Sequence, residues 1–192
     1  RELLMNNLMN PKYPEGRNLF QDKNILITAA AGSGIGFSTA KRFLEEGANI
    51  FISDVHQGRL DDAIESLRKL KMGEVQGCLC NVTSDEEIEA MFKEAIACYS
   101  SLNGVINNAG LGGESLLENM TNDAWDLVMD VTLNGAMKIM RAAIPVLKDT
   151  QGVIVNNASV LGWRAQAGQS HYAAAKAGVM ALTRCVALET VD

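Results

Sequence analysis

A serine, a tyrosine and a lysine in the last third of the sequence have the residue types and spacing of an acid–base site. Tyr172 and Lys176 lie four residues apart in a helix-like stretch, so they share one helix face. A nearby ammonium stabilises a phenolate, and this lets a tyrosine exchange protons with a substrate. Ser159 lies thirteen residues before the tyrosine and adds a hydroxyl from the loop after an apolar strand.

A glycine-rich turn after the first apolar strand is the second chemical signal. Its candidate binding residues are Gly32, Ser33, Gly34, Ile35 and Gly36. Glycines at this point let the backbone approach a pyrophosphate, which then lies on the helix N-terminus. The spacing differs from G-x-G-x-x-G, and such a turn can also be purely structural. Its place after the first strand favours dinucleotide binding.

A carboxylate follows the second predicted strand, about 20 residues beyond the glycine turn, where it can accept hydrogen bonds from an adenosine ribose. This residue is Asp54. Because a carboxylate repels a 2′-phosphate, it favours NAD over NADP, and Ser33 rather than Arg or Lys in the turn agrees. The alternative is that Asp54 only caps a loop.

Amide and small residues follow the fourth predicted strand, in the run Asn107, Asn108, Ala109 and Gly110. The small residues leave room for the adenosine or ribose of a cofactor. The amides can tie neighbouring strands together.

Strand and helix signals alternate from residue 23 onward. The predicted strands are 24–28, 48–53, 75–80, 104–107 and 152–156, and the two longest predicted helices are 121–148 and 170–190. Short apolar strands alternating with helices predict a parallel sheet covered on both faces. The fold class is therefore α/β, a doubly wound, Rossmann-like sheet. The first helix is expected to turn Ile35, Phe43 and Leu44 inward, and Ser84 with Glu87 to form a capping box.

Length and composition limit the classes of function that are possible. The 192 residues fit one domain at 23–192 preceded by an N-terminal arm at 1–22, and the sequence ends inside a predicted helix, so we expect a C-terminal truncation. A net charge of −6 argues against nucleic-acid and anionic-membrane partners. Four cysteines without a framework predict buried thiols at Cys78 and Cys80, no metal site, and a reducing, cytoplasmic compartment.

Taken in order, the glycine turn, Asp54, the NNAG run, Ser159 and the Tyr172-x-x-x-Lys176 pair resemble the short-chain dehydrogenase/reductase family over roughly residues 23–190. The resemblance implies NAD(P)-dependent hydride transfer between nicotinamide and a secondary alcohol or ketone. It makes Tyr172 the general acid–base, Lys176 the residue that activates it and holds the nicotinamide ribose, and Ser159 a hydrogen-bond partner of the reacting oxygen. The stretches NNASVLGWRAQ and QSHYAAAKAGVMALTRC are similar to 3-oxoacyl reductases and to dehydrogenases of bacterial steroid-ring degradation that act on CoA-linked acids.

Three positions depart from the family pattern. Counting back from the last glycines, Ala29 and Ala30 stand where the family has Thr-Gly, so the turn tolerates negative φ there or its register differs. Asn81, followed by Val82, stands where an aspartate commonly meets the adenine amine. Thr132 replaces the asparagine of the proton relay, and its hydroxyl could hold a relay water. Asn134 would lie on the opposite helix face and cannot stand in for it.

The remaining expectations concern the substrate and the assembly. Trp163 and Arg164, in the loop between the serine and the tyrosine, are candidates for lining a substrate pocket, against simple loop packing. His171 is expected to make a helix-start or loop contact rather than to take part in catalysis. The family commonly forms dimers or tetramers through its two long helices, which here carry Ala136, Ala143, Ala173, Ala177 and Ala181. The departures leave one alternative, a non-catalytic, dinucleotide-binding scaffold, and a sugar-nucleotide epimerase fits the glycine spacing less well.

Overall fold

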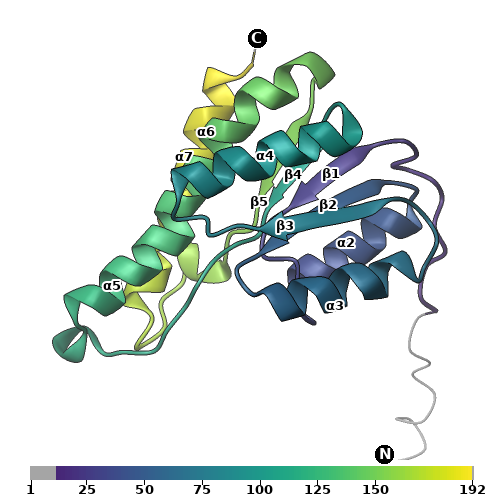
Figure 1. Cartoon of the computed structure of the whole chain (residues 1–192). Helices are drawn as coiled ribbons and strands as arrows, with labels where there is room; N and C mark the ends of the chain where they lie inside the picture. Colours follow the sequence, from purple (N-terminus) through teal and green to yellow (C-terminus); the bar gives the residue numbers. More distant parts are fainter. Residues whose placement is uncertain (1–11, 192) are drawn as a thin grey trace, which may run out of the picture.

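A five-stranded parallel sheet forms the centre of the computed structural model, which describes residues 12–191 (Figure 1). The strands are β1 (Asn24–Ile27), β2 (Asn49–Asp54), β3 (Val75–Leu79), β4 (Gly104–Asn107) and β5 (Val153–Asn156). Their order in the sheet is β3-β2-β1-β4-β5. The direction of winding reverses between β1 and β4, and ligands of such sheets bind outside the carboxyl ends of the strands at this point. The predicted Rossmann-like α/β fold is confirmed.

Helices cover the sheet in two layers (Figure 1). One layer holds α2 (Ile35–Glu45) and α3 (Gln57–Arg68); the other holds α4 (Asp85–Tyr99), α6 (Gly135–Leu147) and α7 (Ser170–Glu189). The helix α5 (Asn122–Met129) runs into α6 through a π-helical segment, η2 (Asp130–Asn134). Short 3₁₀ turns are η1 (Leu117–Asn119), η3 (Lys148–Thr150) and η4 (Val160–Gly162). The helix predicted over 121–148 is thus interrupted at η2.

The strand residues divide between two apolar cores. Leu26, Phe51 and Val105 point to the α4 and α6 side, and Ile25 and Ile52 point to the α2 and α3 side. Because β1 and β2 are buried on both faces, they read as continuous apolar runs.

The edge strand β5 does not fit the expected covering of both sheet faces. Val153 and Val155 expose 60% and 51% of their surface. The apolar side chains of α2 and α3 belong to a core that includes residues of β1, β2 and β3 and borders Ile106 of β4, and no residue of β5 belongs to it. Within residues 12–191, the face of β5 that carries these two valines is therefore not covered by a helix.

Two local expectations have different outcomes. Ser84 caps α4 as predicted, since its hydroxyl accepts from the Glu87 N–H at 3.2 Å. The reciprocal half of the predicted capping box does not form, because the Glu87 carboxylate accepts from the Asn81 N–H at 2.8 Å. Ile35, predicted to face inward from the first helix, is instead 68% exposed, while Leu44 is fully buried. Ile35 begins α2 directly after the glycine turn, so it lies beyond the edge of the apolar core.

The described part of the N-terminal arm, residues 12–22, contains no helix or strand but packs on the end of α2. The nearly buried carboxylate of Glu46 accepts from the N–H groups of Arg17, at 2.7 Å, and Leu19, at 3.3 Å, and it pairs with Arg42. The Arg17 N–H is the largest cause that lowers the pKa of Glu46. The first eleven residues of the predicted arm lie outside the described part of the chain.

The two strand cysteines, both predicted to be buried, differ in how far they are buried. Cys80 is buried and Cys78 half-buried, and burial raises the pKa of each thiol to about 12. Among the helices of residues 12–191, none combines the length and the hydropathy needed to cross a bilayer.

Candidate active site

Tyr172 and Lys176 lie on one face of the first turns of α7. The Lys176 ammonium is 5.7 Å from the centroid of the Tyr172 ring. Lys176 is only 3% exposed, and its Nζ donates to the backbone carbonyl of Asn157 at 2.6 Å. Burial lowers the pKa of this lysine. The structure therefore holds a cation beside a tyrosine, as the sequence predicted, and places that cation in a largely dehydrated position.

The loop that follows β4 passes directly over this pair. A Cβ built on Gly110 would lie 3.2 Å from the Lys176 ammonium, and one on Gly112 would lie 3.6 Å from the Tyr172 ring. The carboxyl end of β4 and the start of α7, which are about 60 residues apart in sequence, thus meet at the point where the winding of the sheet reverses.

Ser159 is held between β5 and α7. Its side chain caps η4 by accepting from the Leu161 N–H at 3.2 Å. The end of η4 packs closely on α7, because a Cβ on Gly162 would approach the sulfur of Met180 to 2.6 Å. Next along the chain, Trp163 is 77% exposed and Arg164 is exposed as well.

Thr132 lies in η2 and is almost fully buried. Its hydroxyl donates to the Leu111 carbonyl and accepts from the Leu111 N–H, both at 2.9 Å. Its only proton is therefore used by the Leu111 carbonyl, and one lone pair of the hydroxyl oxygen remains to accept from a water. Asn134 is exposed and donates to Asp130 at 2.7 Å, so it stays away from the site as predicted.

The glycine turn begins at Thr28, not at Ala29. The Thr28 hydroxyl accepts from the N–H groups of Asn108 and Ala109, both at 3.0 Å. Ala29 adopts φ +50°, a conformation that favours glycine. Of the two possibilities that the sequence left open, the register differs: Thr28 and Ala29 occupy the Thr-Gly positions, and the turn is one residue longer. A turn at negative φ is wrong for Ala29.

The later glycines of this turn serve two purposes. A Cβ on Gly36 would lie 2.5 Å from the Ala29 carbonyl oxygen, so this position must lack a side chain for α2 to pack on the turn. A Cβ on Gly32 or Gly34 would meet nothing within 4 Å. Those two positions therefore leave open space above the N-terminus of α2, as a bound pyrophosphate requires.

Asp54 ends β2 and is 8% exposed. Its carboxylate accepts from the N–H groups of His56, at 3.1 Å, and Ala31, at 3.3 Å, so it ties the glycine turn to the loop after β2. Loop capping is therefore one of its tasks. Asn81 is exposed and its carbonyl oxygen caps the turn to Thr83, whereas the side chain of Val82 belongs to the core.

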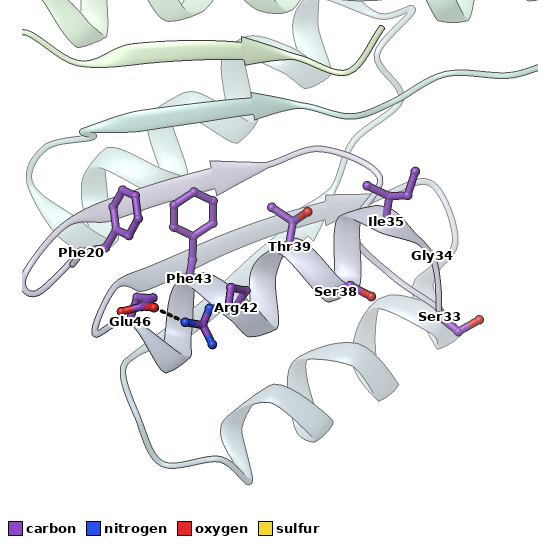
Figure 2. A pocket seen from close by; sticks show the side chains of 9 residues that line it. All are labelled: Phe20, Ser33, Gly34, Ile35, Ser38, Thr39, Arg42, Phe43 and Glu46. Carbon is purple, nitrogen blue, oxygen red and sulfur yellow. Dashed lines mark hydrogen bonds and ion pairs between the residues drawn. The ribbon is translucent and has the colours of Figure 1, made fainter. Parts of the chain in front are cut away.

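A pocket of about 680 Å³ extends from the glycine turn along the outer side of α2 (Figure 2). Ser33, Gly34 and Ile35 line one end, and Phe20 and Phe43 line the other. Ser159, Tyr172 and Lys176 are not part of it. The pocket is thus continuous with the turn but separate from the acid–base pair.

His171 is 98% buried, directly before Tyr172. A Cβ built on Gly113 would lie 3.1 Å from its Nε2, so the imidazole packs under the loop after β4. Its Nδ1 is buried and has no hydrogen-bond partner among the described residues. The imidazole therefore makes a loop contact, one of the two kinds of contact that the sequence left open.

A family model described as short chain dehydrogenase matches residues 23–192. The chain belongs to the short-chain dehydrogenase family. A reductase of Mycobacterium tuberculosis named for a hydroxy-methyl-oxo-hexahydroindene-carboxyl-CoA is 49% identical over 98% of this chain and 72% of its own length. A 3-oxoacyl-[acyl-carrier-protein] reductase of Thermotoga maritima is 35% identical over 88% of this chain and 68% of its own length. A short chain dehydrogenase of Mycobacterium smegmatis is 50% identical, with a TM-score of 0.92 over 95% of this chain and 77% of its own.

As a member of this family, the chain is an oxidoreductase that acts on alcohol and carbonyl groups and binds a nicotinamide dinucleotide. The relatives named above are reductases and dehydrogenases, so the alternative of a non-catalytic scaffold gains no support from them.

Sequence reasoning missed three contributors to the dehydrogenase site. Thr28 bonds the start of the glycine turn to Asn108, and Leu111 bonds the loop after β4 to Thr132. Asn157 accepts the hydrogen bond of the lysine. For Asn157, the available signal was the repeated Asn-Asn pair, whose first residue ends both β4 and β5.

Proposed function

We propose that this short-chain dehydrogenase interconverts a secondary alcohol and a ketone with Tyr172 as general acid–base. The burial of the Lys176 ammonium 5.7 Å from the Tyr172 ring is the observation that supports this most directly. The cation stabilises the phenolate, so Tyr172 can take a proton from an alcohol or return one to a carbonyl oxygen. Ser159, at the neighbouring strand end, donates a hydrogen bond to the same oxygen.

The residues present fit a dinucleotide. The open positions Gly32 and Gly34, with Ser33, Ile35 and the close-packed Gly36, would receive the pyrophosphate. Asn81, Val82, Asn108, Ala109 and Gly110 would border the adenosine and the ribose groups, and Tyr172 and Lys176 the nicotinamide ribose. When bound, the nicotinamide supplies or accepts the hydride. The protein's own part is to hold both reactants still and to move one proton.

The proposed cofactor is NAD rather than NADP. Asp54 presents a carboxylate at the end of β2, where it would meet the adenosine ribose and repel a 2′-phosphate. Arg59 lies 4.0 Å from this carboxylate but is mostly exposed, so solvent screens much of its charge.

The proposed substrate is a hydroxyacyl or ring ketone carried on coenzyme A. The name of the reductase from Mycobacterium tuberculosis supports this class, because that relative is named for a bicyclic, CoA-linked compound. The exposed indole of Trp163 offers an apolar surface after Ser159, and the exposed guanidinium of Arg164 offers a partner for a phosphate.

We place the enzyme in the cytoplasm and expect it to be a homodimer or homotetramer. Ala177 and Ala181 are exposed on α7, and Leu127 is 54% exposed on α5, so these helices present a surface for a second copy. Ala136 and Ala143, also predicted at the interface, are buried within the protomer and cannot contribute. Light scattering that finds a stable monomer would contradict the assembly.

The function is tested by measuring NADH oxidation with a panel of 3-oxoacyl-CoA thioesters, bicyclic ketone CoA thioesters and the matching free ketones, with NADPH in parallel. We expect turnover with NADH on at least one CoA thioester and a clear preference over NADPH. Turnover only on free ketones would reject the CoA-linked class. Binding of NADH without turnover of any carbonyl would reject the proposed reaction.

A further inference from the structure

The carboxyl ends of β4 and β5 carry two asparagine pairs that differ in what they connect. Asn107 donates to Asn156 at 3.0 Å, and Asn157 donates to Asn108 at 2.8 Å. The residues of the first pair are directly opposite each other in the parallel ladder, and the second pair is one residue further along both strands. Because successive side chains alternate between the faces of a strand, the two pairs point in opposite directions.

The first pair leads into the layer of α6 and α7. Asn156 donates to the Thr183 hydroxyl at 3.0 Å, and Asn107 donates to the Ala136 carbonyl at 3.2 Å. Thr183 in turn donates to a carbonyl of its own helix at 2.7 Å. These contacts attach α6 and α7 to the sheet and do not lead toward the glycine turn.

The second pair leads from the glycine turn to the acid–base pair. The Asn108 amide donates to the Thr28 carbonyl, at 3.1 Å, and to the Ala29 carbonyl, at 2.9 Å. Its own carbonyl oxygen accepts from Asn157, whose backbone carbonyl accepts from the Lys176 ammonium at 2.6 Å. A continuous hydrogen-bonded path thus joins the start of the glycine turn to Lys176.

The Asn157 carbonyl that accepts from Lys176 is held in place by other hydrogen bonds of the same residue. The Asn157 backbone N–H donates to the Asn107 carbonyl at 3.0 Å, and its side chain donates to Asn108, so both bonds fix the residue whose carbonyl accepts from the ammonium. A buried ammonium that loses its acceptor is costly, so Lys176 follows the position of this carbonyl.

We propose that Asn157 is a positioning residue that couples the glycine turn to Lys176. Asn157 does not touch the reacting atoms in this role. Its side chain fixes its own backbone carbonyl, that carbonyl fixes the ammonium, and Asn108 transmits any shift of the Thr28–Ala29 peptides in both directions. The inference rests on the proposed function, because it assigns Lys176 to the cofactor ribose and to Tyr172.

The test compares Asn157→Ala with the matched control Asn156→Ala, one residue earlier on the same strand. For Asn157→Ala we expect about a two- to tenfold weaker Kd for NADH, from the loss of one neutral hydrogen bond, and a lower kcat with little change in the KM of the carbonyl substrate. For Asn156→Ala we expect a lower melting temperature with Kd and kcat close to wild type. Should the alanine variant not fold, Asn157→Ser replaces it in every measurement.

A double-mutant cycle with Asn108→Ala tests the path itself. If the path exists, the two substitutions have non-additive effects on the Kd for NADH, because either one breaks the same connection. The inference is overturned if the effects are additive, or if Asn156→Ala changes Kd and kcat as much as Asn157→Ala does. NADH titration by fluorescence needs no turnover, so this cycle can succeed or fail independently of the proposed carbonyl reduction.

Discussion

The two ends of the carboxyl edge of the sheet differ in how completely protein contacts fix their residues. At the β4 and β5 end, the side chains of Thr132, Asn108 and Lys176 each bond to backbone carbonyls or N–H groups of distant segments. At the β1 and β2 end, Asp54 also accepts from a distant segment, through the Ala31 N–H, but Gly32 and Gly34 face open space and Ile35 is exposed.

The end fixed by protein contacts therefore suits the chemical step, and the open end suits cofactor binding. An acid–base pair loses rate when it is misplaced by a fraction of an ångström, so the groups around it profit from rigid protein partners. A dinucleotide brings many hydrogen-bonding groups of its own and can order an open turn as it binds. Substitutions of Tyr172, Thr132 or Asn157 should therefore lower turnover, whatever else they change, whereas those at the β1 and β2 end should leave the chemical step intact and change affinity, cofactor choice or stability.

The largest effect is expected for Tyr172→Phe, which removes the proton donor and keeps the ring. Turnover on an accepted substrate should fall by about 10²- to 10⁴-fold, while NADH binding changes little. Steady-state rates and fluorescence titration measure the two quantities. Tyr99→Phe is the matched control: it loses one hydrogen bond to Ile50 outside the site and should keep wild-type turnover. Wild-type turnover in Tyr172→Phe would refute the mechanism.

Thr132→Val should have the next largest effect, because it leaves the N–H and the carbonyl of Leu111 without their partner. We expect about a tenfold lower kcat and a loss of about 2 kcal/mol of unfolding free energy. Urea unfolding and steady-state kinetics measure these changes. Thr132→Ser keeps the hydroxyl and should retain most of the kcat. If the serine and valine variants lost equal activity, the bonds to Leu111 would not be what matters.

Asp54→Asn should change cofactor choice and leave the chemistry intact. The amide keeps the shape and one acceptor, but it no longer repels a 2′-phosphate, so the preference for NADH over NADPH should fall by about tenfold, or about 1.4 kcal/mol. The ratio of kcat/KM values for the two cofactors is the readout. Asp61→Asn, an exposed aspartate of α3, serves as the charge control. An unchanged ratio in Asp54→Asn would remove the argument for NAD.

The smallest effect is expected for Ala29→Gly. Because Ala29 holds φ +50°, glycine should stabilise the fold by about 1 kcal/mol, raising the melting temperature by about 2–4 °C. Ala31→Gly, at a neighbouring residue without positive φ, should instead destabilise by about 0.4–1 kcal/mol. Differential scanning calorimetry measures both, and equal shifts in the two variants would contradict the assigned conformation of Ala29.

The sequence by itself determined the sheet and the acid–base pair. Apolar β-branched runs alternating with amphipathic helices require a parallel sheet, and a four-residue spacing puts Tyr172 and Lys176 on one helix face wherever that helix packs. The strand Gly104–Asn107 has the predicted bounds, and the helix Ser170–Glu189 ends one residue before the predicted end. These features depend on local periodicity, which is written directly in the order of residues.

The tertiary structure alone decided how the site is held. The pairing of Asn157 with Asn108, the bond from Lys176 to the Asn157 carbonyl and the hold of Thr132 on Leu111 join residues that are 19 to 49 positions apart. The start of the glycine turn at Thr28 also became clear only from its contact with the strand beside it. No spacing rule specifies such contacts, because they depend on the register of neighbouring strands and on where a π-helical turn places one buried hydroxyl.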